Sequence, residues 1–259
     1  MKNILFLFLT AIAFFLTACA DKGIHDSYSQ YHDQTAKQLY TTAQKNIKHN
    51  RPDEAINKLE AQSALYPFGA YSEEGLVTLI YAYYLNDDFS EALATASRYL
   101  RLYPRGNDAD YAYYMKGVIS TNLGLSWTQR KAGINPVSRD LDGMKDAYFA
   151  FNQLVIGFPQ SVYTPDALAR MRYIRNLFAE NAFDIAQFYY DREAYVAAAN
   201  RATDVVMHYD GTPAVISALG LMIKSYRKLG MDTDANRAVA ILQASYPNSS
   251  VCKSLCPVQ

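Results

Sequence analysis

An internal repeat limits how this sequence can fold more than any other feature. An aromatic residue followed by proline recurs along the chain, and an alanine stands 12 residues before each proline or its counterpart. The aromatic pairs are Tyr66-Pro67, Tyr103-Pro104, Phe158-Pro159, a degenerate Tyr209-Asp210, and Tyr246-Pro247; the matching alanines are Ala55, Ala92, Ala147, Ala198 and Ala235. Mostly apolar residues follow each alanine at offsets of 4, 7 and 11, which is the spacing of one helical face. Because proline lacks an N–H and disfavours α geometry in the residue before it, each helix should end there.

A second helix is predicted before each of these helices. In the first three repeats it is centred on Ala43, Ile80 and Gly117, which lie 37 residues apart, and in the last two it covers about 164–190 and 213–229. Paired helices at this period are typical of tetratricopeptide repeats. The sequence therefore predicts an all-α fold, a right-handed superhelical solenoid of five tetratricopeptide-like helix pairs. The alternative is an irregular helical bundle with chance Tyr-Pro pairs, which five matches at one offset argue against.

Two intervals are longer than 37 residues, and the extra residues predict local features. In the second interval, the 18 extra residues fall at about 124–142 and contain two glycines and a proline, so they predict an inserted loop. This loop is either part of a binding face or a solvated segment without a function of its own. In the third, 14 extra residues without Gly or Pro predict a helix of about 25 residues, nearly 40 Å long. We expect this helix to brace the last repeats against the first three.

The N-terminus has the pattern of a lipoprotein signal. Lys2 gives a positive start, residues 4–16 are mostly apolar but too few to span a bilayer, and Leu16-Thr17-Ala18-Cys19 matches the bacterial lipobox. Similarity to bacterial lipoproteins implies removal of residues 1–18 as a signal peptide and acylation of Cys19. The alternative is an ordinary secretory signal with a chance cysteine.

The residue after the lipobox cysteine predicts the destination. It is Ala20 rather than the Asp that retains lipoproteins in the inner membrane, so we expect the chain on the periplasmic face of the outer membrane, held by its N-terminal lipid. The predicted layout of the mature chain is a flexible tether at 19–30, repeats one to three at 31–159, repeats four and five at 160–247, and a C-terminal tail at 248–259.

Charge and motif content argue against nucleic-acid binding and against an enzyme. The chain has 25 Lys+Arg and 25 Asp+Glu, and loss of residues 1–18 removes Lys2 and no acid, which leaves a formal charge of −1. Nucleic-acid binders usually show a basic excess. The motifs HExxH, GxSxG, GxGxxG and GxxxxGK[ST] do not occur, and the four histidines lack metal-ligand spacing. Acids such as Asp87-Asp88 and Asp108 with Asp110 stand at predicted helix starts, where they favour capping. We expect no catalytic residues, no metal and no cofactor.

Tyrosine is abundant, and the repeat register predicts a groove lined by it. The chain has 22 tyrosines, against 12 phenylalanines and one tryptophan. In paired-helix repeats the first helix of each pair lines the concave side, so this face should present Tyr40, Gln44, Tyr81, Tyr84, Tyr111 and Tyr114. Tyrosine combines a large apolar area with a polar tip and few rotamers, which suits capture of a peptide. The competing interpretation is that many of these tyrosines pack between helices.

Two cysteines remain once Cys19 is acylated, and they lie four residues apart. On a helix, the spacing of Cys252 and Cys256 brings their side chains to one face, so in an oxidising periplasm they are able to pair. The alternative is that they are unpaired residues of the tail. We favour the disulfide.

The lipobox and the five repeats together resemble the BamD family, the lipoproteins of the β-barrel assembly (BAM) machine. The resemblance covers nearly the whole mature chain and is strongest in residues 139–202, which contain an Arg-Asp start, an FPQSVY segment, an Arg-rich helix, a Tyr-Tyr pair and an Ala-rich helix. Glu193 departs from the glycine that the family commonly has after Arg192, so the turn here lacks its usual residue.

The resemblance implies a scaffold and receptor at the outer membrane rather than an enzyme. It implies that the C-terminal repeats bind the periplasmic POTRA domains of the barrel protein BamA, alongside other BAM lipoproteins, and that the N-terminal repeats bind the terminal aromatic signal of unfolded β-barrel substrates. Arg175 and Arg192 match Arg-containing stretches of the family and are expected near the BamA interface. The tyrosine groove would then accept the substrate peptide.

Other kinds of repeat lipoprotein offer competing functions. A pilotin for pilus or secretin assembly would show the same lipobox and repeats, and residues 139–202 favour the BamD family over it. A cell-wall hydrolase with a repeat adaptor is the enzymatic alternative, but no unassigned segment is long enough to hold its catalytic domain.

Overall fold

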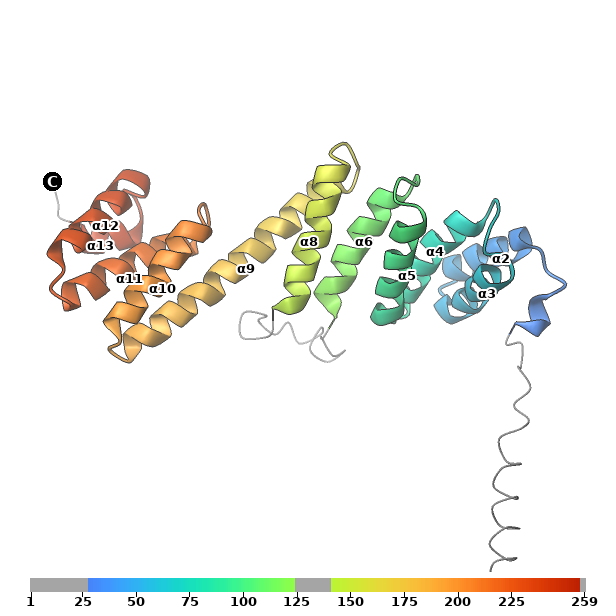
Figure 1. Ribbon diagram of the computed structural model, residues 1–259, viewed down its shortest axis with the longest axis horizontal. Coiled ribbons are helices and arrows are strands. Elements are labelled where there is room, and N and C mark those ends of the chain that lie inside the picture. Colours follow the sequence, from blue (N-terminus) through green and yellow to red (C-terminus); the bar gives the residue numbers. More distant parts are fainter. Residues whose placement is uncertain (1–27, 124–140, 257–259) are drawn as a thin grey trace, which may run out of the picture. The chain divides into compact units, whose positions relative to one another are not determined.

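Helices make up all the regular structure of the part of the chain that is described (Figure 1). The computed structural model describes residues 28–123 and 141–256. The predicted all-α class is therefore confirmed. The chain divides into two compact units, one ending at Gly75 and the other beginning at Leu76.

Three of the predicted features lie mainly outside the described residues. They are the signal peptide at 1–18, Cys19 with most of the tether, and most of the insertion at 124–142. Among the helices that are described, none is both long and apolar enough to cross a membrane.

The first unit holds the 3₁₀ helix η1 (Ser29–Tyr31), α2 (Ala36–Lys48), α3 (Pro52–Leu65) and the start of α4 (Ser72–Leu85). Thr35 begins α2 with a capping box: its side chain accepts from the N–H of Gln38, whose side chain accepts from the N–H of Thr35. The proline at the start of α3 occupies a position where the helix leaves an N–H without a partner in any case. α2 packs on α3, and Ala43 and Ala55, one from each helix, are fully buried.

The second unit continues the helical pairs. It contains the rest of α4, then α5 (Phe89–Leu102), α6 (Ala109–Asn122), α8 (Asp142–Gly157), α9 (Thr164–Asp191), α10 (Tyr195–His208), α11 (Ala214–Lys228), α12 (Asp232–Ser245) and α13 (Ser250–Leu255). α5 packs on α6, α6 on α8, α10 on α11, and α11 on α12. With 28 residues, α9 is the predicted long helix, and it packs on α8 at one end and on α10 and α11 at the other.

The apolar face predicted from the repeat is buried in every copy. The five repeat alanines are at most 2% exposed, and the residues four and seven positions after each alanine are at most 6% exposed. The polar member of this set is Gln62, which is 1% exposed and whose Nε2 donates to the carbonyl of Tyr71. The one-face spacing of the sequence therefore identifies the core of each pair.

The aromatic residue of each repeat is the C-cap of its helix, as predicted. At all five positions its backbone N–H donates to the carbonyl four residues earlier, at 2.7–3.0 Å. The C-cap φ angles lie between −121° and −139° and the ψ angles between 35° and 63°, so the helical conformation stops at this residue. The prolines that follow four of them impose this stop, since they disfavour α geometry in the preceding residue.

The four turns inside helix pairs that are described in full share one left-handed residue. Asn50, Asp87, Glu193 and Gly230 have φ of 56°, 63°, 62° and 71°, and each stands five residues before its repeat alanine. In every case its N–H donates to the residue three before it, and the next N–H donates five residues back, which is the Schellman pattern of a helix C-terminus. Glu193 therefore keeps the turn geometry that glycine usually provides.

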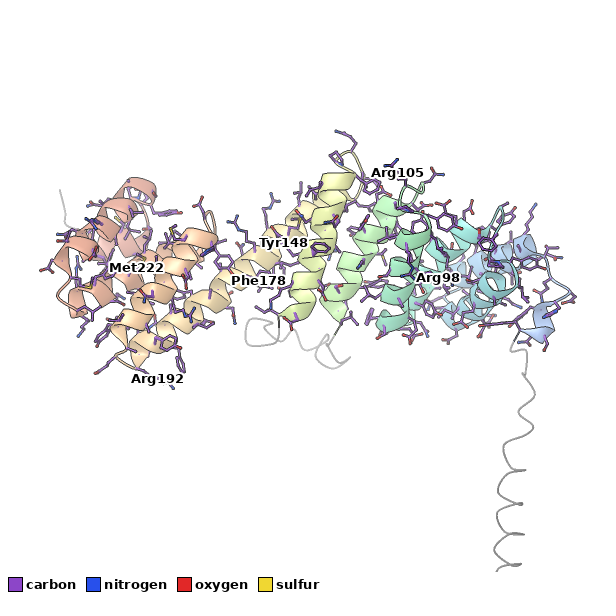
Figure 2. All side chains as sticks on the ribbon, in the orientation of Figure 1. Arg98, Arg105, Tyr148, Phe178, Arg192 and Met222 are labelled. Atoms are coloured by element: carbon purple, nitrogen blue, oxygen red, sulfur yellow. The ribbon has the colours of Figure 1, made fainter. Side chains whose placement is uncertain are left out.

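Two buried apolar clusters stabilise the second unit. The first joins α6, α8 and α9 around Val118, Phe151 and Met171, with Tyr148 and Phe178 packed at its edge (Figure 2). It requires a close approach of α6 to α8.

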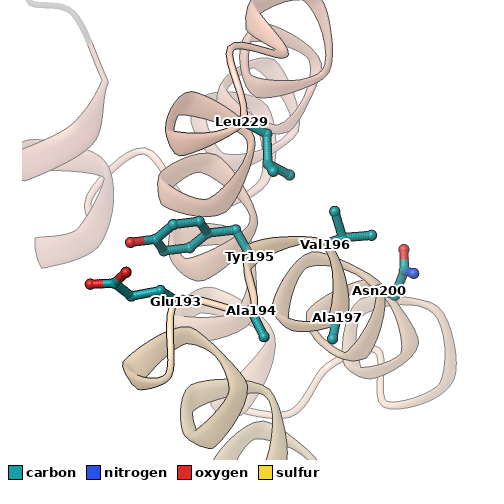
Figure 3. A pocket seen from close by; sticks show the side chains of 7 residues that line it. All are labelled: Glu193, Ala194, Tyr195, Val196, Ala197, Asn200 and Leu229. Carbon is teal, nitrogen blue, oxygen red and sulfur yellow. The ribbon is translucent and has the colours of Figure 1, made fainter.

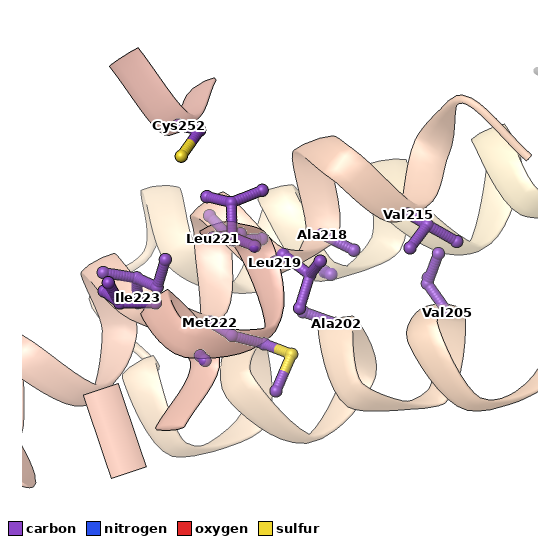
Figure 4. Close-up of a cluster of buried hydrophobic side chains, with 13 residues drawn as sticks. Ala202, Val205, Val215, Ala218, Leu219, Leu221, Met222, Ile223 and Cys252 are labelled. Carbon is purple, nitrogen blue, oxygen red and sulfur yellow. The ribbon is translucent and has the colours of Figure 1, made fainter. Parts of the chain in front are cut away.

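The second cluster lies at the C-terminal end of the chain. It brings together residues of α9, α10, α11 and α12 around Leu219, Ile223 and Leu242. Met222 and Cys252 also belong to it (Figure 4). Cys252 comes from α13, which packs on α11 and α12, so this short helix covers the C-terminal cluster.

Candidate functional site

Tyr111 and Tyr114, two of the predicted groove residues, lie on α6 beside the start of α9. Tyr163 is the N-cap residue of α9 and contacts both of these tyrosines. It can do so because the Phe158-Pro159 pair ends α8 five residues earlier, and the chain turns there before α9 begins. The rings of Tyr163 and Tyr114 stack with centroids 4.9 Å apart and planes 21° apart. The Tyr163 and Tyr111 centroids lie 5.6 Å apart. Three tyrosine rings from two helices thus form one aromatic surface.

A carboxylate and a guanidinium complete this surface. The Tyr114 hydroxyl donates to Asp166 Oδ2 at 2.8 Å, and Arg170 Nε donates to the same oxygen at 2.6 Å. The Arg170 guanidinium carbon lies 5.9 Å from the centre of the Tyr114 ring. We call Tyr111, Tyr114, Tyr163, Asp166 and Arg170 the tyrosine site.

A hydrogen-bonded turn holds Tyr163 in place. The Ser161 hydroxyl donates to Asp110 Oδ2 at 2.6 Å and accepts from the Tyr163 N–H at 3.2 Å. The expectation that acids at helix starts make capping bonds is wrong for Asp88 and Asp108, which occupy N-cap positions without a side-chain capping bond. Asp110 lies in the first turn of α6, where its Oδ1 accepts from the Tyr111 N–H at 2.7 Å while its Oδ2 connects α6 to the turn before α9.

The protonation of the tyrosine site suits recognition rather than acid–base chemistry. Burial raises the pKa of Tyr111, of Tyr114 and of Tyr163 above the ordinary value for a phenol. The hydrogen bonds from Arg170 and then Tyr114 lower the pKa of the Asp166 carboxyl. At neutral pH the phenols are therefore protonated and the carboxylate is charged, whereas a catalytic acid or base needs a pKa near the working pH.

The other predicted groove residues of the second unit differ in their surroundings. Tyr81, on α4, is 40% exposed and lies near enough to Tyr111 to contribute to the raised pKa of that phenol. Tyr84 packs its ring against Phe89, with centroids 5.8 Å apart, and against the α6–α8–α9 cluster. Tyr84 thus fits the competing interpretation, in which tyrosines pack between helices, and Tyr114 and Tyr163 also contact the edge of this cluster.

Tyr40 and Gln44 belong to the first unit. Gln44 Nε2 donates to the Tyr40 hydroxyl at 2.8 Å, and the ring of Tyr40 lies 5.5 Å from that of Tyr71. Gln44 is exposed and Tyr40 is half-buried. These two residues form a smaller aromatic site with Tyr71, described within its own unit.

Arg175 and Arg192 do not share one contact point. Arg175 is half-buried in the middle of α9 and its guanidinium is 3.5 Å from the carbonyl of His208. Arg192 is the exposed C-cap of α9 and its guanidinium lies 3.6 Å from the centre of the Phe188 ring. Their 17-residue separation corresponds to about 25 Å of helix.

A shallow cavity follows Arg192 in the chain. It has a volume of about 470 Å³ and is lined by the turn at Glu193 and Ala194, by the first turns of α10, and by Leu229 at the end of α11 (Figure 3). Val196 in its wall is 60% exposed. Arg192, Phe188 and this cavity together give the C-terminal half an exposed surface of aromatic, apolar and cationic groups.

Comparison with known proteins decides the family. The sequence profile of YfiO, an outer membrane lipoprotein family, matches residues 32–242. A BamD outer membrane protein assembly factor of Pasteurella multocida is 35% identical over 245 residues, which cover 95% of this chain and 91% of the relative. The chain belongs to this family. BamD proteins of Vibrio cholerae (36% over 211 residues; 82% of this chain, 88% of the relative) and of Neisseria meningitidis serogroup A (32% over 250 residues; 96% and 93%) are further relatives.

Two solved structures have a low similarity to this BamD-family chain. One is from a study of Pseudomonas aeruginosa pilF (TM-score 0.41, 14% identity, 87% of this chain and 82% of that chain). Another is PilW, a type IV pilus biogenesis factor (TM-score 0.39, 14% identity, 87% and 100%). We draw nothing about function from likenesses at this level.

Three of the five residues of the tyrosine site were not predicted from the sequence of this BamD-family member. Tyr163, Asp166 and Arg170 lie in the segment of strongest family resemblance, but no rule of helix spacing connects them to α6. The repeat register does contain a signal: Tyr40 and Tyr114 are equivalent positions two 37-residue repeats apart, and so are Tyr71 and Tyr163 once the 18 inserted residues are counted. The ring pair therefore recurs in the first and third repeats.

Metal binding finds no support in the described part of this family member. Across residues 28–123 and 141–256, no group of three or more His, Cys, Asp or Glu side chains could hold a metal ion.

Proposed function

We propose that this chain is a non-enzymatic scaffold and substrate receptor of a β-barrel assembly machine, needed for folding and inserting barrel proteins into the outer membrane. The observation that carries the proposal is the match to BamD assembly factors over 95% of the chain. The proposed layout keeps a lipid anchor at Cys19, a tether to residue 30, three repeats at 31–159 and two at 160–247. The lipidated end holds the helical array on the periplasmic face of the outer membrane.

The tyrosine site is the proposed receptor for substrate. An unfolded barrel protein that ends in an aromatic residue presents a flat apolar ring and a terminal carboxylate. The stacked rings of Tyr114 and Tyr163 offer the aromatic contact. Arg170 is 40% exposed, uses its Nε–H for Asp166 and interacts with the Tyr114 hydroxyl, so only part of its five-donor guanidinium is engaged and the rest can donate to a second carboxylate. Tyr111 extends the aromatic surface.

The C-terminal surface is the proposed contact with the POTRA domains of BamA. Arg and aromatic residues are enriched at the centres of protein interfaces. Arg192 stacked on Phe188, which is 49% exposed, next to the apolar cavity wall at Val196, has this composition. Arg175 lies about 25 Å earlier along α9, beside the His208 carbonyl, and would form a separate part of this contact.

Affinity purification from detergent-solubilised outer membranes tests the proposal. The full-length lipoprotein with a C-terminal tag should recover an outer-membrane β-barrel protein with POTRA domains, together with other lipoproteins. The double variant R192A/V196D should recover several-fold less of the barrel protein, because it removes the stacked cation and places a charge in the apolar contact. Y173A is the matched control, since Tyr173 is 55% exposed on the same helix α9 and stands 19 residues before Arg192.

The identity of the recovered partner distinguishes the competing functions. Recovery of a secretin or pilus subunit in place of the barrel protein would contradict the proposal and favour a pilotin. Equal recovery by R192A/V196D and the control would reject the C-terminal surface while leaving the scaffold role supported.

A further inference from the structure

The last helix of the chain is too short to be stable by itself. α13 has six residues, and isolated helices of this length are unstable in water. Three contacts hold it. The Ser249 hydroxyl caps its start by accepting from the Cys252 N–H, Val251 packs onto Gly220 of α11, and Arg227 donates to the carbonyl of Leu255 at 3.1 Å.

The position of α13 makes it a cover for the end of the array. It packs on both α11 and α12, and Val251, Leu255 and Cys256 lie against the apolar cluster around Leu219 and Ile223. Gly220 leaves the room for it, since a Cβ there would lie 2.6 Å from a methyl group of Val251. Repeat arrays need their terminal apolar face covered, and here a segment outside the five repeats does so.

The two cysteines of α13 lie within bonding reach of each other. Cys252 is 5% exposed, Cys256 is half-buried, and their Sγ atoms are 2.7 Å apart. The Cys256 N–H donates to the Cys252 carbonyl at 2.9 Å, so the pair spans the final turn of the helix and includes its C-cap. A bond at this place would close the last turn of α13 on itself.

We propose that Cys252 and Cys256 form a disulfide that staples α13 in its covering position over the C-terminal cluster. Each thiol loses its hydrogen, one S–S bond forms, and the two electrons and two protons pass to the disulfide of a periplasmic thiol oxidase, which becomes a dithiol. The oxidant depends on the periplasmic location that is part of the proposed function. The pairing itself depends only on the geometry of α13.

The bond is structural rather than a site of thiol exchange. Burial, and then the hydrogen bond with Cys252, raise the pKa of the Cys256 thiol to about 11. Cysteines that exchange rapidly have the opposite property, a pKa lowered toward or below neutrality, because the thiolate is the attacking species. Cys252 is also only 5% exposed, so an attacking thiolate has little access to its sulfur.

Mass spectrometry of the full-length lipoprotein tests the pairing. Protein extracted from membranes without reductant, and alkylated during extraction, should have no alkyl group on either cysteine and should gain two after reduction. In hydrogen exchange, reduction should make the amides of Lys253 and Cys256 exchange about tenfold faster or more, since closure of even a short loop suppresses local opening. C256S keeps the buried Cys252 in place and should show the fast exchange without reductant.

A second sample separates the pairing from the location. The reduced, purified protein is incubated in oxidised glutathione and analysed in the same way. Closure in this buffer, with free thiols in protein from the membranes, would uphold the pairing and contradict the periplasmic placement. Two free thiols in both samples, or exchange that does not change on reduction of an oxidised sample, would overturn the staple.

Discussion

Tyr163 is the residue that determines what the tyrosine site presents. It comes from the turn before α9, stacks on Tyr114 and contacts Tyr111, so its ring closes the aromatic surface from the side opposite α6. Arg170 adds the one cation of that surface, at 40% exposure. The two residues should therefore contribute separately to binding of a substrate peptide, Tyr163 through its ring and Arg170 through charge.

We predict that Y163A weakens binding of a peptide with a C-terminal aromatic residue by about tenfold, because an aromatic pair and its buried area are lost. Fluorescence anisotropy with a labelled peptide measures the dissociation constant. R170Q should remove the preference for the free carboxylate over the C-terminal amide of the same peptide. Y173A, at an exposed tyrosine of α9, is the control and should bind normally. Equal losses in Y163A and Y173A would contradict the site.

Glu193 is a second residue whose effect is local, since it holds a left-handed conformation with φ of 62°. Side chains other than Gly, Asn and Asp adopt this conformation at a cost of about 1 kcal/mol or more. E193G should raise the free energy of unfolding by up to about 1 kcal/mol, and urea denaturation measures it. The equivalent turn gives the opposite change: G230A should lower the free energy by about 1 kcal/mol, because φ is 71° there and a Cβ would meet no atom within 4 Å. A destabilised E193G would refute the backbone explanation.

At the scale of helices, the spacing between α6 and α8 depends on one glycine. A Cβ on Gly117 would lie 2.4 Å from a ring carbon of Phe151, which is fully buried in the α6–α8–α9 cluster. Neither helix can move away without opening that cluster. The equivalent positions in the first two repeats are Ala43 and Ile80, so glycine is required here by the bulk of Phe151 and not by the repeat.

We predict that G117V lowers the free energy of unfolding by about 1–3 kcal/mol through overpacking against Phe151. Gly157, at the end of α8, has open space around its Cα, so G157V should change the free energy by no more than about 0.5 kcal/mol. Thermal and urea unfolding of both variants provide the measurement. Similar values for the two would show that helix propensity, and not the contact with Phe151, determines the effect.

At the scale of the whole molecule, attachment to the membrane and stability of the fold are separable. Cys19 lies outside the described residues, and the helical repeats begin after the tether. Two or more acyl chains on one cysteine hold a protein to a membrane almost permanently. The membrane attachment of this chain is therefore proposed to depend on a residue that contributes nothing to its core.

We predict that C19A moves the protein from the membrane fraction to the soluble periplasmic fraction, with an unchanged unfolding midpoint. Cell fractionation with immunoblotting, and urea denaturation of the purified protein, measure the two properties. A20D is the matched control, because it keeps the acylation site and should stay in the membrane fraction but appear in the inner membrane. Membrane retention of C19A would reject the lipid anchor.

The sequence by itself determined the all-α class, the ends of the repeat helices, the buried face of each helix pair and the length of α9. These features follow from local rules: the 3.6-residue period, the effect of proline on its neighbours, and the small residue needed where helices cross. Only the tertiary structure showed that Tyr163, Asp166 and Arg170 meet Tyr114, and that α13 covers the C-terminal cluster. Tyr114 and Asp166 are 52 positions apart, on either side of an insertion. Whether such residues meet depends on where the packed helices place their turns in space, and the repeat period of the sequence does not predict that.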